Sequence, residues 1–162
     1  GHIFVPAYAI VQGVFLGTIS MVFNKMYPGI VVQAIFLTFG TLGALLLAYK
    51  SGLIRATENF KLGVFAATGG IAFLYLINFV MGFFSSGIGI ISSNNTMGIL
   101  FSAFVVVIAA LNLVLDFDFI EEGVEKGAPK YMEWFGAFGL LVTLIWLYIE
   151  ILRLLAKLNS RR

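Results

Sequence analysis

The sequence predicts an all-α protein, a polytopic transmembrane helix bundle, from its composition, its charge distribution and its apolar runs. Of the 162 residues, 60% are hydrophobic and 11% are charged, and the mean hydropathy is +1.02. A soluble domain carries more charge, because its surface must meet water. No Asp, Glu, Lys or Arg lies between Lys61 and Asp116, a gap long enough for two membrane crossings. The outer surface is therefore expected to contact lipid.

Five apolar runs approach the length of roughly 20 residues that a helix needs to cross a bilayer. They cover about 3–23, 30–49, 62–84, 97–116 and 134–155, and we expect them to form one transmembrane domain over 1–162. Turn-forming residues, such as Pro28-Gly29 and the polar segment 92–96, separate the runs. Glycines recur within them, and we expect these to face neighbouring helices, because close backbone approach drives helix association in lipid. The glycines concerned are Gly13, Gly17, Gly40, Gly43, Gly69, Gly70, Gly136 and Gly139.

Several functional classes are disfavoured by what the sequence lacks. There is no cysteine, and His2 is the only histidine, so thiolate chemistry, disulfides and imidazole-based metal sites are not expected. No HExxH motif and no recognisable Ser-Lys or Asp pair is present, so an enzyme is the weakest hypothesis and no cofactor is expected. The net charge is only +2 and the basic residues are scattered, which argues against nucleic-acid binding. The start at Gly-His, without Met, leads us to expect natural residues upstream.

The basic residues give little information on orientation, because five lie on each predicted side. One side holds Lys50, Arg55, Lys61, Lys126 and Lys130, and the other holds Lys25, Arg153, Lys157, Arg161 and Arg162. We expect the loop from Lys50 to Lys61 to be cytoplasmic, since its charges fall in a short connection, where the positive-inside bias operates.

Seven of the eight carboxylates lie at or after Asp116. Four of them, Glu121, Glu122, Glu125 and Glu133, are interpreted as part of a solvated loop that follows the fourth helix. Asp116 and Glu150 differ, because apolar residues continue on both sides of each. An ionisable side chain at membrane depth suggests a functional site, since it needs a partner or a wet cavity. The alternative for both is a structural ion pair.

Helical spacing suggests partners for these two acids. Arg153 lies three residues after Glu150 and can pair with it, either within the bundle or as an interfacial pair that reaches the headgroups. Thr143 lies two turns before Glu150, and Asn112 lies one turn before Asp116. Two such polar stripes would make a narrow hydrophilic path if they faced each other. Carboxylates in that setting cannot all ionise easily, so they exchange protons, cations or basic neighbours. This indicates cation handling or pH sensing, and leaves a channel and a sensor as alternatives.

Two long stretches resemble a known family. Residues 110–123, ALNLVLDFDFIEEG, are followed by GAPKYMEW at 127–134 and by the apolar run 140–155; the early part is PAYAIVQGVFLG at 6–17 with YPGIVVQA at 27–34. Together they resemble the bacterial YccA-like branch of the Bax-inhibitor family, over essentially the whole chain. Members have about seven helices, so the chain is similar to the last five. The resemblance implies a location in the bacterial cytoplasmic membrane.

The resemblance further implies a Ca²⁺ leak that is gated by proton uptake on two aspartates of the last two helices. Asp116 matches the first aspartate, whereas the second position is occupied by Thr143, so that Glu150 is the candidate substitute. The first hypothesis is therefore a pH-sensitive cation channel with Asp116 in its pore. Asp118 and Glu150 are accessory acids, Asp116 and Asp118 are tentative Ca²⁺ ligands, and Arg153 is a competing internal cation. The second is a non-conducting regulator that binds membrane proteases or stress-response proteins. The expected partners are the lipid bilayer, Ca²⁺, protons and other membrane proteins.

Overall fold

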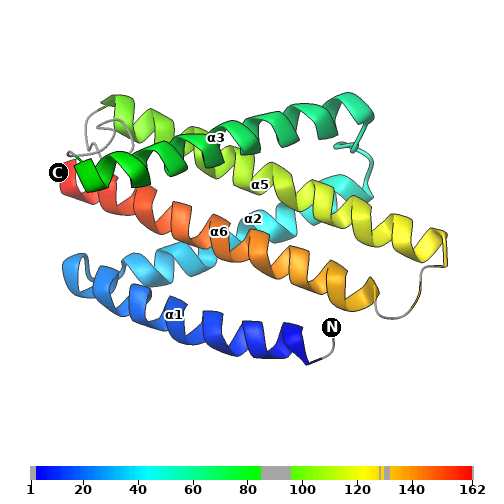
Figure 1. Cartoon of the computed structure of the whole chain (residues 1–162), viewed down its shortest axis with the longest axis horizontal. Coiled ribbons are helices and arrows are strands. Elements are labelled where there is room, and N and C mark those ends of the chain that lie inside the picture. Colours follow the sequence, from blue (N-terminus) through cyan, green and yellow to red (C-terminus); the bar gives the residue numbers. More distant parts are fainter. Residues whose placement is uncertain (1–2, 85–95, 128, 130–131, 162) are drawn as a thin grey trace.

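The chain folds into a bundle of long helices (Figure 1). The computed structural model describes residues 3–84, 96–127, 129 and 132–161. The helices in this part are α1 (Phe4–Met26), α2 (Ile30–Lys50), α3 (Glu58–Phe84), α5 (Thr96–Glu125) and α6 (Met132–Arg161). The described residues contain no strand, so the predicted all-α fold class is confirmed.

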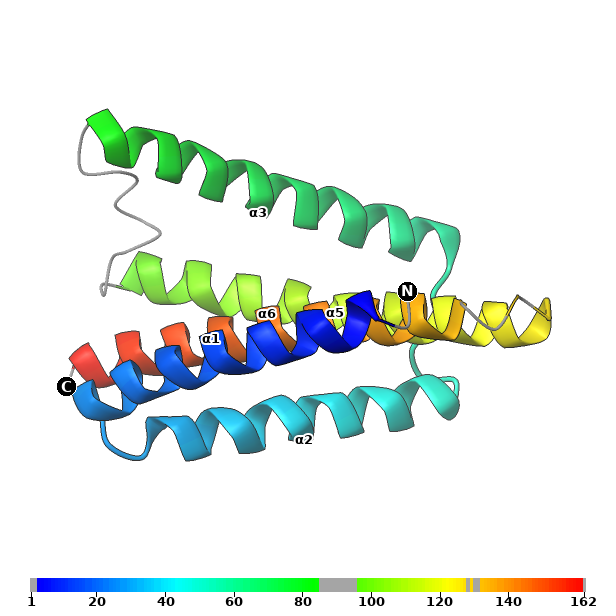
Figure 2. The ribbon, with the colours of Figure 1, turned by 60° about the horizontal axis from the view of Figure 1, so that its bottom comes forward.

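All five helices are long and apolar enough to cross a membrane, and the protein is an integral multi-pass membrane protein. Successive helices run in opposite directions (Figure 2). The turn between α1 and α2 therefore lies at the same end of the bundle as the last turns of α6, which we call the C-terminal end. The connections from α2 to α3 and from α5 to α6 lie at the opposite end, which we call the hairpin end.

The last two helices extend well beyond the predicted limits of 97–116 and 134–155. Helix α5 continues to Glu125 and stops where Gly127 adopts a positive φ of 63°, a conformation that glycine tolerates and that commonly ends a helix. Glu121, Glu122 and Glu125 are thus exposed residues of α5, and Glu133 is an exposed residue in the first turn of α6, so their interpretation as a loop is wrong. Hydropathy marks where side chains stop being apolar, whereas the backbone hydrogen bonds of a helix continue into water.

The core of the bundle lies between α2, α5 and α6. Its main cluster joins Ile30 and Ala34 of α2 to Leu113 of α5 and to Leu147 of α6, all of them buried. Helix α3 adds a smaller cluster, in which Ile71 packs against Val105 and Ile108 of α5. Helix α1 packs on α6 through the edge-on ring contact of Tyr8 with Phe138 and the hydrogen bond between the Ser20 and Tyr148 hydroxyls. Helices α5 and α6 therefore occupy the centre.

Most of the glycines do not serve as helix contacts in this structure. A Cβ atom at Gly136 would lie 3.0 Å from Ile120 Cγ1, and one at Gly139 would lie 3.6 Å from Asp116 Oδ1. The other six glycines of the prediction have open space around them, so the expectation that they face helices fails in the described part of the chain. Among these glycines, close contacts are confined to the place where α5 side chains meet α6.

Candidate functional site

Asp116 lies on the side of α5 that faces α6, at the level of Gly139 and Thr143. The absence of a side chain at Gly139 leaves room for the Asp116 carboxylate, and the Thr143 side chain lies beside it. Thr143 is itself only 8% exposed, and its hydroxyl donates to the Gly139 carbonyl oxygen at 3.0 Å. Asp116 Oδ2 is buried and has no hydrogen-bond partner among the described residues. The helix contact therefore holds a carboxylate that is poorly hydrated and incompletely bonded.

Glu150 lies on α6, about two turns after Thr143, and is 2% exposed. The Tyr75 hydroxyl of α3 donates to Glu150 Oε2 at 2.9 Å, and Arg153 Nη1 lies 3.8 Å from Glu150 Oε1. Arg153 also donates to the Tyr75 hydroxyl at 3.1 Å and stacks over its ring, with the guanidinium carbon 5.3 Å from the ring centroid. Thus the Arg153 partner that the i,i+3 spacing suggests is present, and Tyr75 completes the cluster.

Asn112 does not join Asp116 in a stripe that faces α6. Its side-chain amide donates to Thr68 Oγ1 of α3 at 2.9 Å and to the Ile108 carbonyl oxygen at the same distance. Helix α5 has α3 and α6 as separate neighbours, and four residues advance the helical direction by about 40°. That rotation is enough for Asn112 and Asp116 to contact different helices. The predicted pair of facing stripes is therefore reduced to the meeting of Asp116 with Thr143.

Asp118 is an anchoring residue at the hairpin end. Its Oδ2 lies 2.7 Å from Lys61 Nζ of α3, and its Oδ1 accepts a hydrogen bond of 3.3 Å from the Tyr49 hydroxyl of α2. Two residues turn a helix by about 200°, so Asp116 and Asp118 contact different elements. The structure does not bring these tentative Ca²⁺ ligands together. Nor do the residues it describes contain any group of three or more carboxylate, histidine or cysteine side chains that could hold a metal ion.

One polar pattern, on α3, was not recognised from the sequence, and a second, on α6, was recognised only from Thr143 to Glu150 and not as far as Lys157. On α3, Lys61, Thr68 and Tyr75 follow one another at seven-residue intervals, and each contacts a polar residue of α5 or α6. On α6, the buried Thr143 and Glu150 are followed, seven residues on, by the buried Lys157. Seven residues are nearly two turns, so each set lies along one side of its helix. This spacing is the sequence signal that could have revealed both patterns.

Lys157 is buried at the C-terminal end of the contact between α5 and α6, with 5% of the residue exposed. Its ammonium donates to Ser102 Oγ at 2.7 Å and to the Gly98 carbonyl oxygen at 3.3 Å. Polar groups thus occur at three levels along α6, about 10 Å apart at 1.5 Å per residue. Asp116 and Thr143 form the first level, Glu150 with Arg153 the second, and Lys157 the third.

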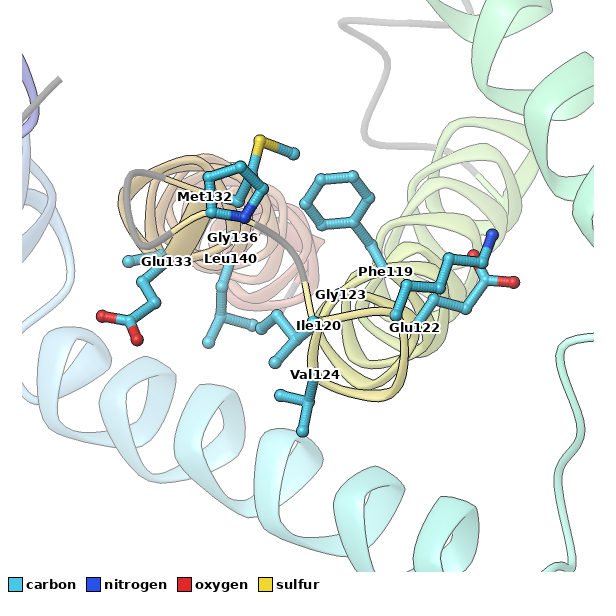
Figure 3. A pocket seen from close by; sticks show the side chains of 13 residues that line it. Phe119, Ile120, Glu122, Gly123, Val124, Met132, Glu133, Gly136 and Leu140 are labelled. Atoms are coloured by element: carbon cyan, nitrogen blue, oxygen red, sulfur yellow. The ribbon is translucent and has the colours of Figure 1, made fainter.

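A pocket of about 690 Å³ opens between the end of α5 and the start of α6. Figure 3 shows Phe119, Ile120 and Leu140 around it, with Glu122 and Glu133 on opposite sides. Ile120 lies one turn beyond Asp116 on α5, so the pocket reaches within roughly 6 Å, measured along the helix, of the Asp116 level. The rim carries two acids, Glu122 and Glu133, against one lysine, Lys126, so it can attract cations, and the partly buried Asp116 carboxylate lies farther in.

Comparison with known proteins gives one match. A family model described as Bax inhibitor 1 like matches residues 1–160, a range that includes all the polar residues of the three levels. No curated protein and no solved structure matches the chain. The YccA-like branch and the helix number of the complete family fold remain predictions.

Proposed function

We propose, from the premise that the chain belongs to the Bax inhibitor 1 like family, that this membrane protein provides a pH-sensitive leak for Ca²⁺ in the bacterial cytoplasmic membrane. Asp116 is the acid of the pathway. The leak would pass along the contact of α5 with α6, entering at the pocket of the hairpin end.

The proposal depends on one observation, that an oxygen atom of the Asp116 carboxylate is buried without a hydrogen bond among the described residues. A buried polar atom is nearly always hydrogen-bonded, and an exception calls for an explanation. Among the described residues, Asp116 Oδ2 and Glu150 Oε1 are such exceptions. Glu150 Oε1 has the Arg153 guanidinium 3.8 Å away, whereas Asp116 lies where Gly139 leaves space beside its carboxylate. A proton or a cation bound to this carboxylate would supply the missing interaction, which is why the site supports cation handling.

The same carboxylate supplies the pH sensitivity. A cation and a proton compete for Asp116, because either neutralises its charge in the poorly hydrated interior. Proton uptake therefore releases a bound cation and changes the occupancy of the pathway. Glu122 and Glu133 at the rim of the pocket would raise the local cation concentration, an effect that Lys126 offsets in part and that salt screens. Glu150 stays an accessory acid, since Tyr75 and Arg153 already engage it.

The test is ⁴⁵Ca²⁺ uptake into liposomes that contain the protein, measured at two pH values. We expect Asp116→Asn to lower uptake roughly tenfold, which corresponds to about 1.4 kcal/mol, and to remove its pH dependence. Asp118→Asn is the matched control, because this neighbouring acid of the same helix is bonded to Lys61 and Tyr49 and should conduct normally. Equal uptake by the wild type and by Asp116→Asn at both pH values would remove Asp116 from the mechanism.

Thr143→Asp sharpens this test. It places a second carboxylate beside Asp116, at the position where the family resemblance puts the second aspartate. Two carboxylates in contact share a proton, so we expect the uptake to depend on pH more steeply in this variant than in the wild type. An unchanged pH profile would show that the Asp116 level does not set the response to protons.

A non-conducting regulator is the second candidate, and the basic side chains beyond Glu150 favour it. Arg153 and Lys157 place two positive groups near one buried acid, which opposes the passage of a divalent cation. A regulator would show no uptake in any variant and would be recovered with membrane proteases or stress-response proteins after crosslinking in native membranes. Uptake that depends on Asp116 would exclude this candidate.

A further inference from the structure

Lys157 is an ammonium held by neutral oxygen atoms inside the bundle. Its ammonium donates to the Ser102 hydroxyl at 2.7 Å and to the Gly98 carbonyl at 3.3 Å. Ser102 is 1% exposed, so its hydroxyl faces the protein interior. Burying an ammonium is costly, and it is tolerated where several oxygens replace its water shell. The first two turns of α5 are therefore arranged to hold a cation.

Two charged neighbours of Lys157 lie on its own helix. Arg153 lies one turn before it and Glu150 two turns before it, and both act on Lys157 electrostatically, Arg153 unfavourably and Glu150 favourably. Glu150 is shared with Tyr75 and Arg153, so it offsets the Lys157 charge only in part. The C-terminal end of the contact between α5 and α6 thus carries an excess of positive charge, in contrast with the acidic level at Asp116.

Hydroxyl and carbonyl oxygens are also the ligands that proteins present to alkali and alkaline-earth cations. A lysine ammonium bound to such oxygens excludes a free cation in two ways, because it fills the space and because it repels another positive charge. Lys157 is tethered to α6, so its ammonium leaves this position when its side chain changes rotamer or when α6 moves relative to α5.

We propose that Ser102 Oγ and the Gly98 carbonyl form a cation position and that Lys157 fills it as a tethered cation, which closes this end of the pathway. The cation position stands on the contacts of Lys157 alone, and its effect on the leak rests on the proposed function. When Lys157 does not fill this position, we expect it to bind a monovalent cation such as K⁺. Lys157 is then a blocking residue, and its removal opens the position to ions.

The first experiment asks whether the vacated position binds K⁺, independently of any conduction. In detergent, we expect the Tm of Lys157→Ala to rise by roughly 2–4 °C when KCl replaces choline chloride. The wild type should not respond, and neither should Lys157→Met, whose apolar side chain still fills the space. If the alanine variant does not fold, Lys157→Asn takes its place. A Tm that is independent of K⁺ in the folded small variant would overturn the cation position.

The second experiment measures ⁸⁶Rb⁺ and ⁴⁵Ca²⁺ uptake into liposomes. We expect Lys157→Ala to raise both roughly tenfold and Lys157→Arg, which keeps the charge, to match the wild type. A K⁺-dependent Tm without uptake in any variant would disprove the leak and leave the cation position intact. Uptake that depends on Asp116 but is the same with and without the Lys157 charge would disprove the blocking role and leave the leak intact.

Discussion

Helices α6 and α3 both pack against α5, but by different means. The contact between α5 and α6 is close, buried and partly made by glycine, and it encloses Asp116 at one end and Lys157 at the other. Helix α3 buries only Val64 and Ile71 among its described residues. It is tied to the bundle by polar side chains at intervals of seven residues, and Figure 2 shows it standing apart from the other helices.

This difference has a physical reason. In lipid, apolar side chains gain little by leaving the acyl chains, so helix association depends on close packing and on polar contacts. The contact of α5 with α6 depends on close packing, and the attachment of α3 depends on polar contacts. We infer that the position of α3 is more easily changed by the loss of a single hydrogen bond than the contact of α5 with α6, which separates only at a larger cost.

The largest effect on stability is expected where the two kinds of contact meet, at Glu150. Glu150→Ala leaves Arg153 and Tyr75 without the buried carboxylate that both engage, and we expect a loss of about 3 kcal/mol in the free energy of unfolding. Unfolding by denaturant in detergent measures it. Glu133→Ala, at an exposed acid in the first turn of α6, is the matched control and should change little. Equal stability of the two variants would show that the Glu150 cluster does not hold the helices together.

Substitution of Gly136 is expected to disrupt the close contact of α5 with α6. Gly136→Leu forces a side chain against Ile120, where a Cβ atom would already lie at 3.0 Å, and we expect a loss of about 2 kcal/mol. Gly70→Leu on α3 is the control, since nothing lies within 4 Å of a Cβ atom there. The two Tm values are compared in one detergent. Should Gly70→Leu destabilise as much as Gly136→Leu, the distinction between the two contacts is lost.

The smallest effect on stability, about 1 kcal/mol, is expected from Tyr75→Phe, which removes one hydroxyl from the attachment of α3. Its effect on the position of α3 should be larger. The chain has no cysteine, so spin labels can be placed on single cysteines introduced in α3 and α6, and the distance between them measured.

Tyr148→Phe is the control for this measurement, because the Tyr148 hydroxyl bonds to Ser20 and so joins α6 to α1. We expect the distance distribution between α3 and α6 to broaden in Tyr75→Phe and to stay as in the wild type in Tyr148→Phe. Identical distributions in all three proteins would mean that the polar ties do not position α3.

The fold could be predicted from the sequence because apolar runs of bilayer length have few other structures available. The helix ends were less predictable: α5 runs to Glu125 because charged residues in water do not interrupt a helix. Asp116, Glu150 and Arg153 were recognised as charges in apolar surroundings. Their detailed contacts with Tyr75 and Thr143 depend on how helices rotate against each other, which composition does not specify.

Other residues of the site show the same limit. Asn112 and Asp118 were grouped with Asp116 because they are close in sequence, but rotation about α5 turns them toward other helices. Lys157 was counted only among the basic residues of one predicted side, and nothing in its local sequence indicated that it is buried. Ser102 looked like an ordinary helix residue, because nothing local indicates that a lysine some 55 positions later reaches it.

The central claim, that ions reach Asp116 from water along the contact of α5 with α6, is tested most directly by thiol labelling of two single-cysteine variants. Thr143→Cys places the thiol beside Asp116, and Val142→Cys places it on the exposed side of α6, toward lipid. We expect a water-soluble, positively charged methanethiosulfonate to modify Thr143→Cys and Ca²⁺ to slow this reaction, while Val142→Cys stays unreactive. An inert Thr143→Cys, or equal reaction at both positions, would contradict an aqueous path to Asp116.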